Sequence, residues 1–146
     1  FIDTDTTHLL TFLFCLAIYI FFISVYSIHA YIAITISFYF HEIGHYLAAK
    51  RFNIYIESVD LTVFGGSTLM EEIDNPKENL FVSLTGPIFG FISLIFIYPY
   101  LEVFMTVDYK IFVICLCVAL GNGLNLIPIK GSDGYHILKS IREILF

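Results

Sequence analysis

Long apolar stretches alternate with short polar connections along most of this 146-residue chain. Four stretches approach the length of about 20 apolar residues that a helix needs to cross a membrane. They cover residues 9–28, 30–49, 80–98 and 109–126. The first contains no charged residue, and the second is closed by Lys50 and Arg51. The pattern therefore predicts an all-α polytopic membrane protein with about four transmembrane helices.

The longest polar segment, residues 52–79, separates the second and third apolar stretches. Residues 58–63 alternate polar and apolar side chains, which is typical of a strand. Phe64-Gly65-Gly66 follows as a predicted turn, and residues 67–70 form a second short extended piece. We therefore expect a small β-hairpin between the second and third helices, although an ordinary interfacial loop fits the same periodicity equally well.

Prolines and caps define the remaining elements. Asn75-Pro76 suits the N-cap and first position of the third helix. Pro87 lies inside that helix, where its missing N–H predicts a kink, and Pro99 marks the predicted end. The tail, residues 135–146, has apolar side chains at helical spacing, which predicts an amphipathic helix on or in the membrane surface.

Composition strengthens the membrane interpretation. The chain is 58% hydrophobic and 14% charged, with a mean hydropathy of +0.85, whereas soluble domains carry about 25% charged residues. The formal net charge of -6 comes without a basic patch, which argues against nucleic acid as a partner. The three cysteines lie in apolar stretches, and we interpret them as small buried side chains.

One polar motif, His41-Glu42-Ile43-Gly44-His45, interrupts the second apolar stretch. On a helix, residues four apart share one face, so the two imidazoles can hold a zinc ion from one side. A carboxylate at Glu42 can take a proton from water at the metal. A second interpretation turns these three residues outward at an interface near Lys50. We favour a metal inside the bundle, because it neutralises and orients all three groups together.

Basic residues provide an independent test of topology. With four spans, both termini and the segment 50–79 lie on one side of the membrane, together with six of the seven basic residues. The positive-inside rule makes that side cytoplasmic. His41 and His45 then lie in the cytoplasmic half of their helix, and Asp133 emerges from the fourth helix on the same side. These three side chains are therefore expected to meet at one depth.

Four motifs follow one another along the chain: His41-Glu42-x-x-His45, Phe64-Gly65-Gly66, Gly86-Pro87 and Asn125-x-x-Pro128-x-x-x-x-Asp133-Gly134. Together they resemble the site-2 protease family of intramembrane zinc metalloproteases. The resemblance covers about residues 30–137. The Phe-Gly-Gly arrangement and the short span count are most similar to the compact bacterial branch, which includes sporulation proteases. We expect a single membrane-embedded protease domain over residues 1–146.

The resemblance implies Zn²⁺ as the cofactor and three metal ligands, which are His41, His45 and Asp133. It implies Glu42 as the general base and Asn125 as the residue that holds the substrate or stabilises the oxyanion. Asn122 is a nearby second candidate that the motif does not require. The family's Gly-Pro motif often continues to an asparagine three residues after the proline, whereas this chain has Gly90 there.

The activity implied is cleavage of peptide bonds in or near transmembrane segments of membrane-spanning or membrane-associated proteins. Because a helix hides its carbonyl groups, the substrate must open locally, and residues 61–70 are expected to pair with it by strand addition. The expected location is a bacterial cell membrane, with both termini and the active site toward the cytoplasm. Alternatives are a membrane metal-binding or transport protein, which leaves Glu42 unexplained, and a catalytically inactive family member.

Overall fold

The computed structural model of the chain describes residues 28–62, 65–106 and 108–146. The elements in these ranges are α2 (Ile28–Arg51), β1 (Ile56–Thr62), β2 (Gly65–Met70), α3 (Pro76–Ile92), α4 (Leu94–Phe104), α5 (Asp108–Leu124) and α6 (Asp133–Leu145). A mostly helical protein with one small β-hairpin is therefore confirmed, whereas the number of membrane spans stays a prediction. The helix expected at residues 9–28 lies outside the described ranges, apart from its last residue.

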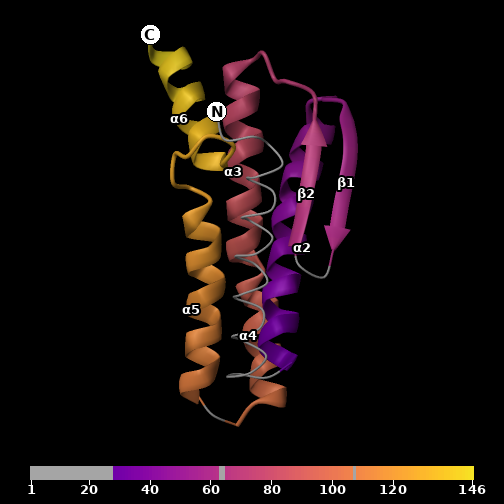
Figure 1. Cartoon of the computed structure of the whole chain (residues 1–146), viewed down its shortest axis with the longest axis vertical. Coiled ribbons are helices and arrows are strands. Elements are labelled where there is room, and N and C mark those ends of the chain that lie inside the picture. Colours follow the sequence, from indigo (N-terminus) through magenta and orange to yellow (C-terminus); the bar gives the residue numbers. More distant parts are fainter. Residues whose placement is uncertain (1–27, 63–64, 107) are drawn as a thin grey trace.

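Three columns of helix run along the long axis of the molecule: α2, the pair α3 and α4, and α5 (Figure 1). The hairpin lies beside the C-terminal half of α2, and α6 lies at the same end of the molecule, next to α3. The connection between α4 and α5 lies at the opposite end. The C-terminal half of α2 thus packs against α3 and the hairpin, at the end of the molecule that carries α6.

Glycines allow α2 and α3 to pack at very short range. A Cβ atom at Gly44 would lie 2.5 Å from the backbone oxygen of Thr85. A Cβ atom at Gly86 would overlap the imidazole of His45. Any larger residue at either position would push the helices apart, so these glycines set the depth at which His45 sits against α3.

The hairpin is an antiparallel two-stranded sheet in which Val59 pairs with Thr68. The predicted hairpin is confirmed, and the interfacial-loop alternative is wrong. The predicted turn needs one correction, because Gly65 and Gly66 belong to β2. A Cβ atom at Gly66 would lie 2.5 Å from Cγ of Glu42, so glycine lets the strand pass close over the α2 motif.

The third predicted helix begins where expected. Asn75 is the N-cap of α3, and its side chain accepts a hydrogen bond from the N–H of Lys77 at 3.0 Å. Pro76 is the first helical residue, where its fixed φ fits and its missing N–H costs nothing. The sequence signals for this helix start are therefore confirmed.

The end of this helix was predicted wrongly. Helical structure passes Pro87, is interrupted at Ser93 instead, and continues past Pro99 to Phe104. The hydroxyl of Ser93 donates to the Gly90 carbonyl oxygen at 2.6 Å, which gives the interruption an internal partner. A proline removes only one helical hydrogen bond, and packing neighbours can compensate for it. Within the described ranges, Pro76–Phe104 is the one helical stretch long and apolar enough to cross a membrane.

The apolar core cluster and most of the buried polar side chains lie in different halves of the bundle, although Ala48, Ala49 and Val82 are buried near the polar ones. The apolar core joins the N-terminal half of α2 to α4 and α5, through Ala30, Ala33, Ile97, Leu101, Ile111, Ile114 and Val118. Buried polar side chains lie toward the end that carries α6, and include Ser37, His41, His45, Asn79, Ser83, Asn122 and Ser140. The predicted C-terminal helix is confirmed as α6, which begins two residues earlier than expected.

Candidate metal centre

Two histidines of α2 form the first part of the site. His41 and His45 are 4% and 8% exposed, and their Nε2 atoms lie 3.1 Å apart. Helical spacing of four residues places both rings on one face, and that face points into the bundle rather than outward. The interpretation that these residues face an interface is therefore wrong.

Asp133, the first residue of α6, completes the cluster. Its Oδ2 lies 3.1 Å from His41 Nε2, and its Oδ1 lies 3.2 Å from His45 Nε2. Among the described residues, these three side chains form a group whose ligand atoms all lie within 4.8 Å of one another. The structure thus brings together the three predicted ligands, of which Asp133 lies more than 80 residues after the two histidines in sequence.

The connection between α5 and α6 turns Asp133 back toward α2. Ser132 caps α6 by accepting a hydrogen bond from the N–H of Tyr135, and it donates its hydroxyl proton to Ile127 O at 2.6 Å. The N–H of Gly134 donates to the carbonyl oxygen of Asn125 at 2.9 Å. A Cβ atom at Gly134 would overlap backbone atoms of the same connection. The Asp-Gly pair is therefore needed for the loop to fold back this tightly.

The partner of each Nδ1 atom assigns the proton of each imidazole. His45 Nδ1 lies 2.9 Å from the backbone oxygen of Val82, which can only accept a hydrogen bond. His41 Nδ1 lies 3.1 Å from Oδ1 of Asn122, which is also an acceptor. Both neutral rings therefore carry their hydrogen on Nδ1, and both Nε2 lone pairs face the centre of the cluster.

This arrangement fits a zinc ion. Tetrahedral zinc with ligands at about 2.0–2.1 Å has ligand–ligand separations of about 3.3 Å, close to the 3.1 and 3.2 Å between these donor atoms. Oδ2 of Asp133 is buried, and no described residue makes a hydrogen bond of suitable geometry to it. Converging lone pairs repel one another unless a cation lies between them. Three protein ligands would leave a fourth position open, as in catalytic zinc sites.

Asp133 has the charge that a metal ligand requires. Burial raises the pKa of this carboxyl group, but protons on the Nε2 atoms of His41 and His45, which these rings can carry when no metal is bound, outweigh burial and lower the pKa to about 2. The group is therefore ionised at neutral pH. An ionised carboxylate binds a metal without first releasing a proton.

Glu42 and Asn125 lie at the border of the ligand cluster. Oε2 of Glu42 accepts a hydrogen bond from the Thr68 hydroxyl of β2 at 2.7 Å. Nδ2 of Asn125, in the connection before α6, lies 3.1 Å from Nε2 of His41. The amide of Asn125 thus contacts a nitrogen atom that would bind the metal, and the carboxylate of Glu42 belongs to the residue that follows this histidine on α2.

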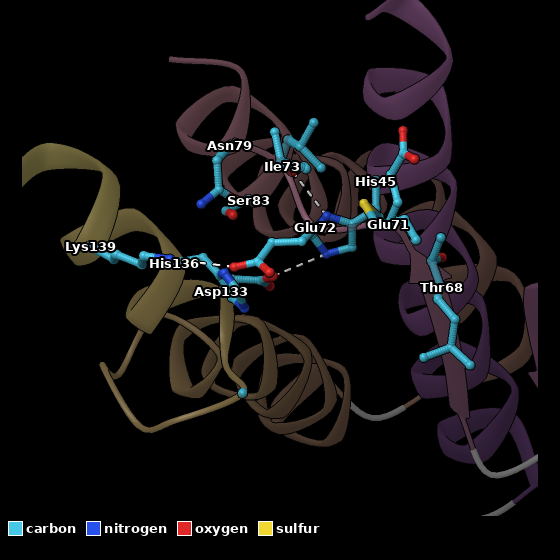
Figure 2. A pocket seen from close by; sticks show the side chains of 14 residues that line it. His45, Thr68, Glu71, Glu72, Ile73, Asn79, Ser83, Asp133, His136 and Lys139 are labelled. Carbon is cyan, nitrogen blue, oxygen red and sulfur yellow. Dashed lines mark hydrogen bonds and ion pairs between the residues drawn. The ribbon is translucent and has the colours of Figure 1, made fainter. Parts of the chain in front are cut away.

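A cavity of about 500 Å³ leads to the cluster between β2, α3 and α6. His45 and Asp133 point toward one another at its wall, while Asn79 and Ser83 line its α3 side (Figure 2). Lys139 of α6 reaches across to Glu72 at 3.9 Å. Residues 68–70 of β2 border the same cavity, so it joins the ligand cluster to the edge of the hairpin.

Sequence reasoning placed all five predicted site residues near one another, and their catalytic roles stay predictions. It did not find the Val82 carbonyl or Thr68, whose parts depend on how α3 and β2 pack against α2. It gave Asn122 only as a second candidate for the role of Asn125, although an amide inside an apolar stretch also indicates that a buried partner exists. The structure shows that this partner is His41.

Comparisons with known proteins agree with one another. A profile of peptidase family M50 matches residues 29–112, which include both histidines. A zinc metalloprotease of Methanocaldococcus jannaschii is 30% identical over 115 residues, or 76% of this chain and 33% of that protein. The chain therefore spans about a third of this curated relative. A solved structure of a site-2 protease from Methanocaldococcus jannaschii is similar at a TM-score of 0.65 and 26% identity, covering 94% of this chain and 66% of that chain.

Proposed function

Because the chain belongs to peptidase family M50, the family of the site-2 proteases, we propose that it is a zinc metalloprotease that cleaves membrane proteins in or near their transmembrane segments. One observation carries the proposal: His41 Nε2, His45 Nε2 and the Asp133 carboxylate converge, and Glu42 follows His41 directly on α2. A bound zinc ion would act as a Lewis acid that activates water and polarises the scissile carbonyl group.

The remaining chemistry is assigned to side chains at the border of the cluster. Glu42 takes the proton of the attacking water and later delivers it to the leaving amine. The Thr68 hydroxyl holds that carboxylate at a fixed angle through its 2.7 Å hydrogen bond. The amide N–H of Asn125 binds the carbonyl oxygen of the substrate as it gains negative charge.

The edge of β2 that has no strand partner among the described residues is the proposed docking site for the unfolded part of the substrate. Residues 68–70 border the same cavity as His45 and Asp133, so a strand added to β2 would run toward the ligands. N-methylation of single peptide bonds in a substrate removes one donor without changing side chains. If strand addition operates, methylation at alternate positions should block cleavage. Equal cleavage of all methylated peptides would contradict it.

We place the site at the cytoplasmic side of a bacterial membrane, with about four spans and both termini cytoplasmic. In support, the end of α2, the start of α3 and the whole of α6 lie at one end of the molecule (Figure 1). The predicted cytoplasmic residues Lys50, Lys77 and Lys139 belong to these segments, whereas Lys110 begins α5 at the other end. Single cysteines at 139 and 110, labelled in intact cells with an impermeant reagent, should react only at 110; labelling at 139 would contradict this orientation.

Replacing Glu42 by glutamine tests the proposed function. The full chain is purified in detergent, and both zinc content and cleavage of a transmembrane peptide are measured for wild type, Glu42→Gln and Glu57→Gln. Glu57 is exposed on β1, outside the ligand cluster, and serves as the matched control. We expect about one zinc per chain in all three proteins, and a loss of cleavage of about 10²–10⁴-fold only for Glu42→Gln.

Other outcomes separate the alternatives. A wild type that binds zinc but never cleaves would favour the inactive family member. Metal uptake that survives Glu42→Gln, in a protein without peptidase activity, would favour a metal-binding or transport protein. A purified protein that holds no metal would remove the basis of the protease proposal.

A further inference from the structure

The two imidazoles of the ligand cluster are oriented by different kinds of partner. His45 Nδ1 bonds to the backbone carbonyl oxygen of Val82 at 2.9 Å, which every residue at that position supplies. His41 Nδ1 bonds to the side-chain oxygen of Asn122 on α5, at 3.1 Å. The orientation of His41 therefore depends on one particular side chain.

The amide of Asn122 has a single orientation that satisfies its surroundings. Its residue is 6% exposed. Nδ2 donates to Oγ of Ser37 and to the backbone oxygen of Val118, both at 2.9 Å. With its two donor hydrogens used in this way, the amide turns Oδ1 toward His41, where it must accept. The amide thus holds the ring proton on Nδ1 and leaves Nε2 free for a metal.

The volume that contains this amide is shared by two helices. Gly90 of α3 is buried, and a Cβ atom placed there would overlap Oδ1 and Cγ of Asn122. A side chain that began at position 90 would therefore enter the same space from the opposite side. The absence of a side chain at Gly90 is what makes room for the amide from α5.

We propose that Asn122 is a positioning residue for the metal ligand His41, and that Gly90 and Asn122 form a matched pair in which one amide, supplied from α3 or from α5, orients that imidazole. The inference rests on the proposed metal site, because it assigns His41 the role of ligand. It adds a residue outside the predicted set of ligands and catalytic groups. It also predicts that the amide can be moved from one helix to the other.

The experiment measures zinc affinity in the full chain in detergent, by competition with a chromophoric chelator. Asn122→Leu keeps the size of the side chain and removes the acceptor. We expect a loss of affinity of about 10–100-fold, which is typical when a hydrogen-bond partner of a metal ligand is removed. Ser140→Ala removes the hydroxyl of another buried polar residue, which is not among the residues that line the cavity, and should leave the affinity within about 2-fold.

Moving the amide distinguishes positioning from packing. Gly90→Asn alone should weaken zinc binding, because two side chains then compete for one volume. Asn122→Gly alone should weaken it too, because the acceptor is gone. The double variant Gly90→Asn/Asn122→Gly should recover most of the affinity, and its cobalt-substituted form should regain the visible absorption spectrum of the cobalt-substituted wild type.

Each result bears on a defined claim. Wild-type affinity in Asn122→Leu would overturn the positioning role. A double variant that is folded by circular dichroism yet binds zinc no better than Asn122→Gly would overturn the matched pair. If wild type itself binds no zinc, the proposed function fails instead, and the two failures are thereby distinguished. If Asn122→Leu does not fold, Ser37→Ala replaces it: it frees the Asn122 amide to turn, and unchanged zinc affinity there would count against the proposal.

Discussion

In the half of the bundle formed by the start of α2, α4 and α5, the buried side chains are alanine, isoleucine, leucine and valine. In the half that carries α6, the same helix α2 buries Ser37, His41 and His45 together with Ala48 and Ala49. Apolar side chains need only well-fitting neighbours, whereas a buried polar atom without a partner costs about 1–3 kcal/mol. Packing in the first half therefore depends on the volumes of the side chains. Packing in the second half depends on which hydrogen-bond donor faces which acceptor.

The comparison explains why contacts in the polar half depend on particular atoms of particular residues. Val82, Asn122 and Thr68 each supply one oriented hydrogen bond to a residue of the α2 motif. Nothing comparable is needed around Leu101, whose partners are replaceable carbon atoms. Equivalent substitutions in the two halves should thus affect different properties, metal binding and catalysis in one and stability in the other.

The largest difference between the two halves is expected when an aspartate is replaced by asparagine at each end of the bundle. Asp133→Asn keeps the size of the side chain but weakens a metal ligand, so zinc affinity should fall more than about 100-fold and cleavage should be lost. Asp108→Asn changes an exposed residue at the start of α5 and should alter neither. Zinc titration and peptide cleavage measure both effects. Equal behaviour of the two variants would contradict the division into halves.

A cavity in the apolar half should affect stability without affecting the metal. Leu101 is fully buried, so Leu101→Ala should lower the free energy of unfolding by about 2–5 kcal/mol. Leu120, at 56% exposed, provides the control, and Leu120→Ala should have little effect. Unfolding in mixed detergent measures stability, and zinc affinity is measured in the folded protein. A large loss of zinc affinity in Leu101→Ala would show that the halves are not independent.

Glycine substitutions test the close approach of α2 and α3 that joins the halves. In Gly44→Ala the new methyl group meets the backbone of Thr85, and the overpacking should cost about 1–3 kcal/mol. In Gly121→Ala the methyl group meets no atom of the described residues within 4 Å, and better helix propensity should stabilise the protein by up to about 1 kcal/mol. The two substitutions are thus predicted to change the free energy of unfolding in opposite directions. Stabilisation of both variants would contradict the packing described for Gly44.

The smallest effect is expected at the hydrogen bond between β2 and Glu42. Thr68→Val removes the hydroxyl that donates to this carboxylate and keeps the shape of the side chain. We expect kcat to fall about 10-fold, with zinc content unchanged, because a hydrogen bond to a charged group contributes about 1.5–3 kcal/mol. Thr106→Val, at an exposed position before α5, is the control. A normal kcat for Thr68→Val would show that the strand does not orient the base.

The sequence allowed prediction of those parts of the site that lie close together in the chain. Helical spacing alone puts His41 and His45 on one face, and the basic residues put Asp133 at the same depth. The Asn75-Pro76 signal located the start of α3. These features rest on local geometry or on topology, both of which a single chain displays directly.

Contacts between elements were not predictable in the same way. The contacts of the α2 histidines with Val82 and Asn122 depend on how the helices are rotated against one another. These rotations depend on the close approaches at Gly44, Gly86 and Gly90, and the spacing of apolar residues does not determine them. The prediction for the end of the third helix was wrong. Pro99 was expected to end the helix, but packing against neighbouring elements can sustain helical structure past a proline. The hydrogen bond from Thr68 to Glu42 forms because the hairpin lies over α2. The strand pattern did not indicate this position of the hairpin.

The central claim is that His41, His45 and Asp133 bind a zinc ion in the polar half of the bundle. X-ray absorption at the zinc edge, on the full chain in detergent, tests this ligand set directly. The account predicts nitrogen and oxygen neighbours at about 2.0–2.1 Å, with the outer-shell scattering of two imidazoles. A sulfur neighbour at about 2.3 Å, which would point to the cysteines, or a protein that retains no zinc, would contradict it.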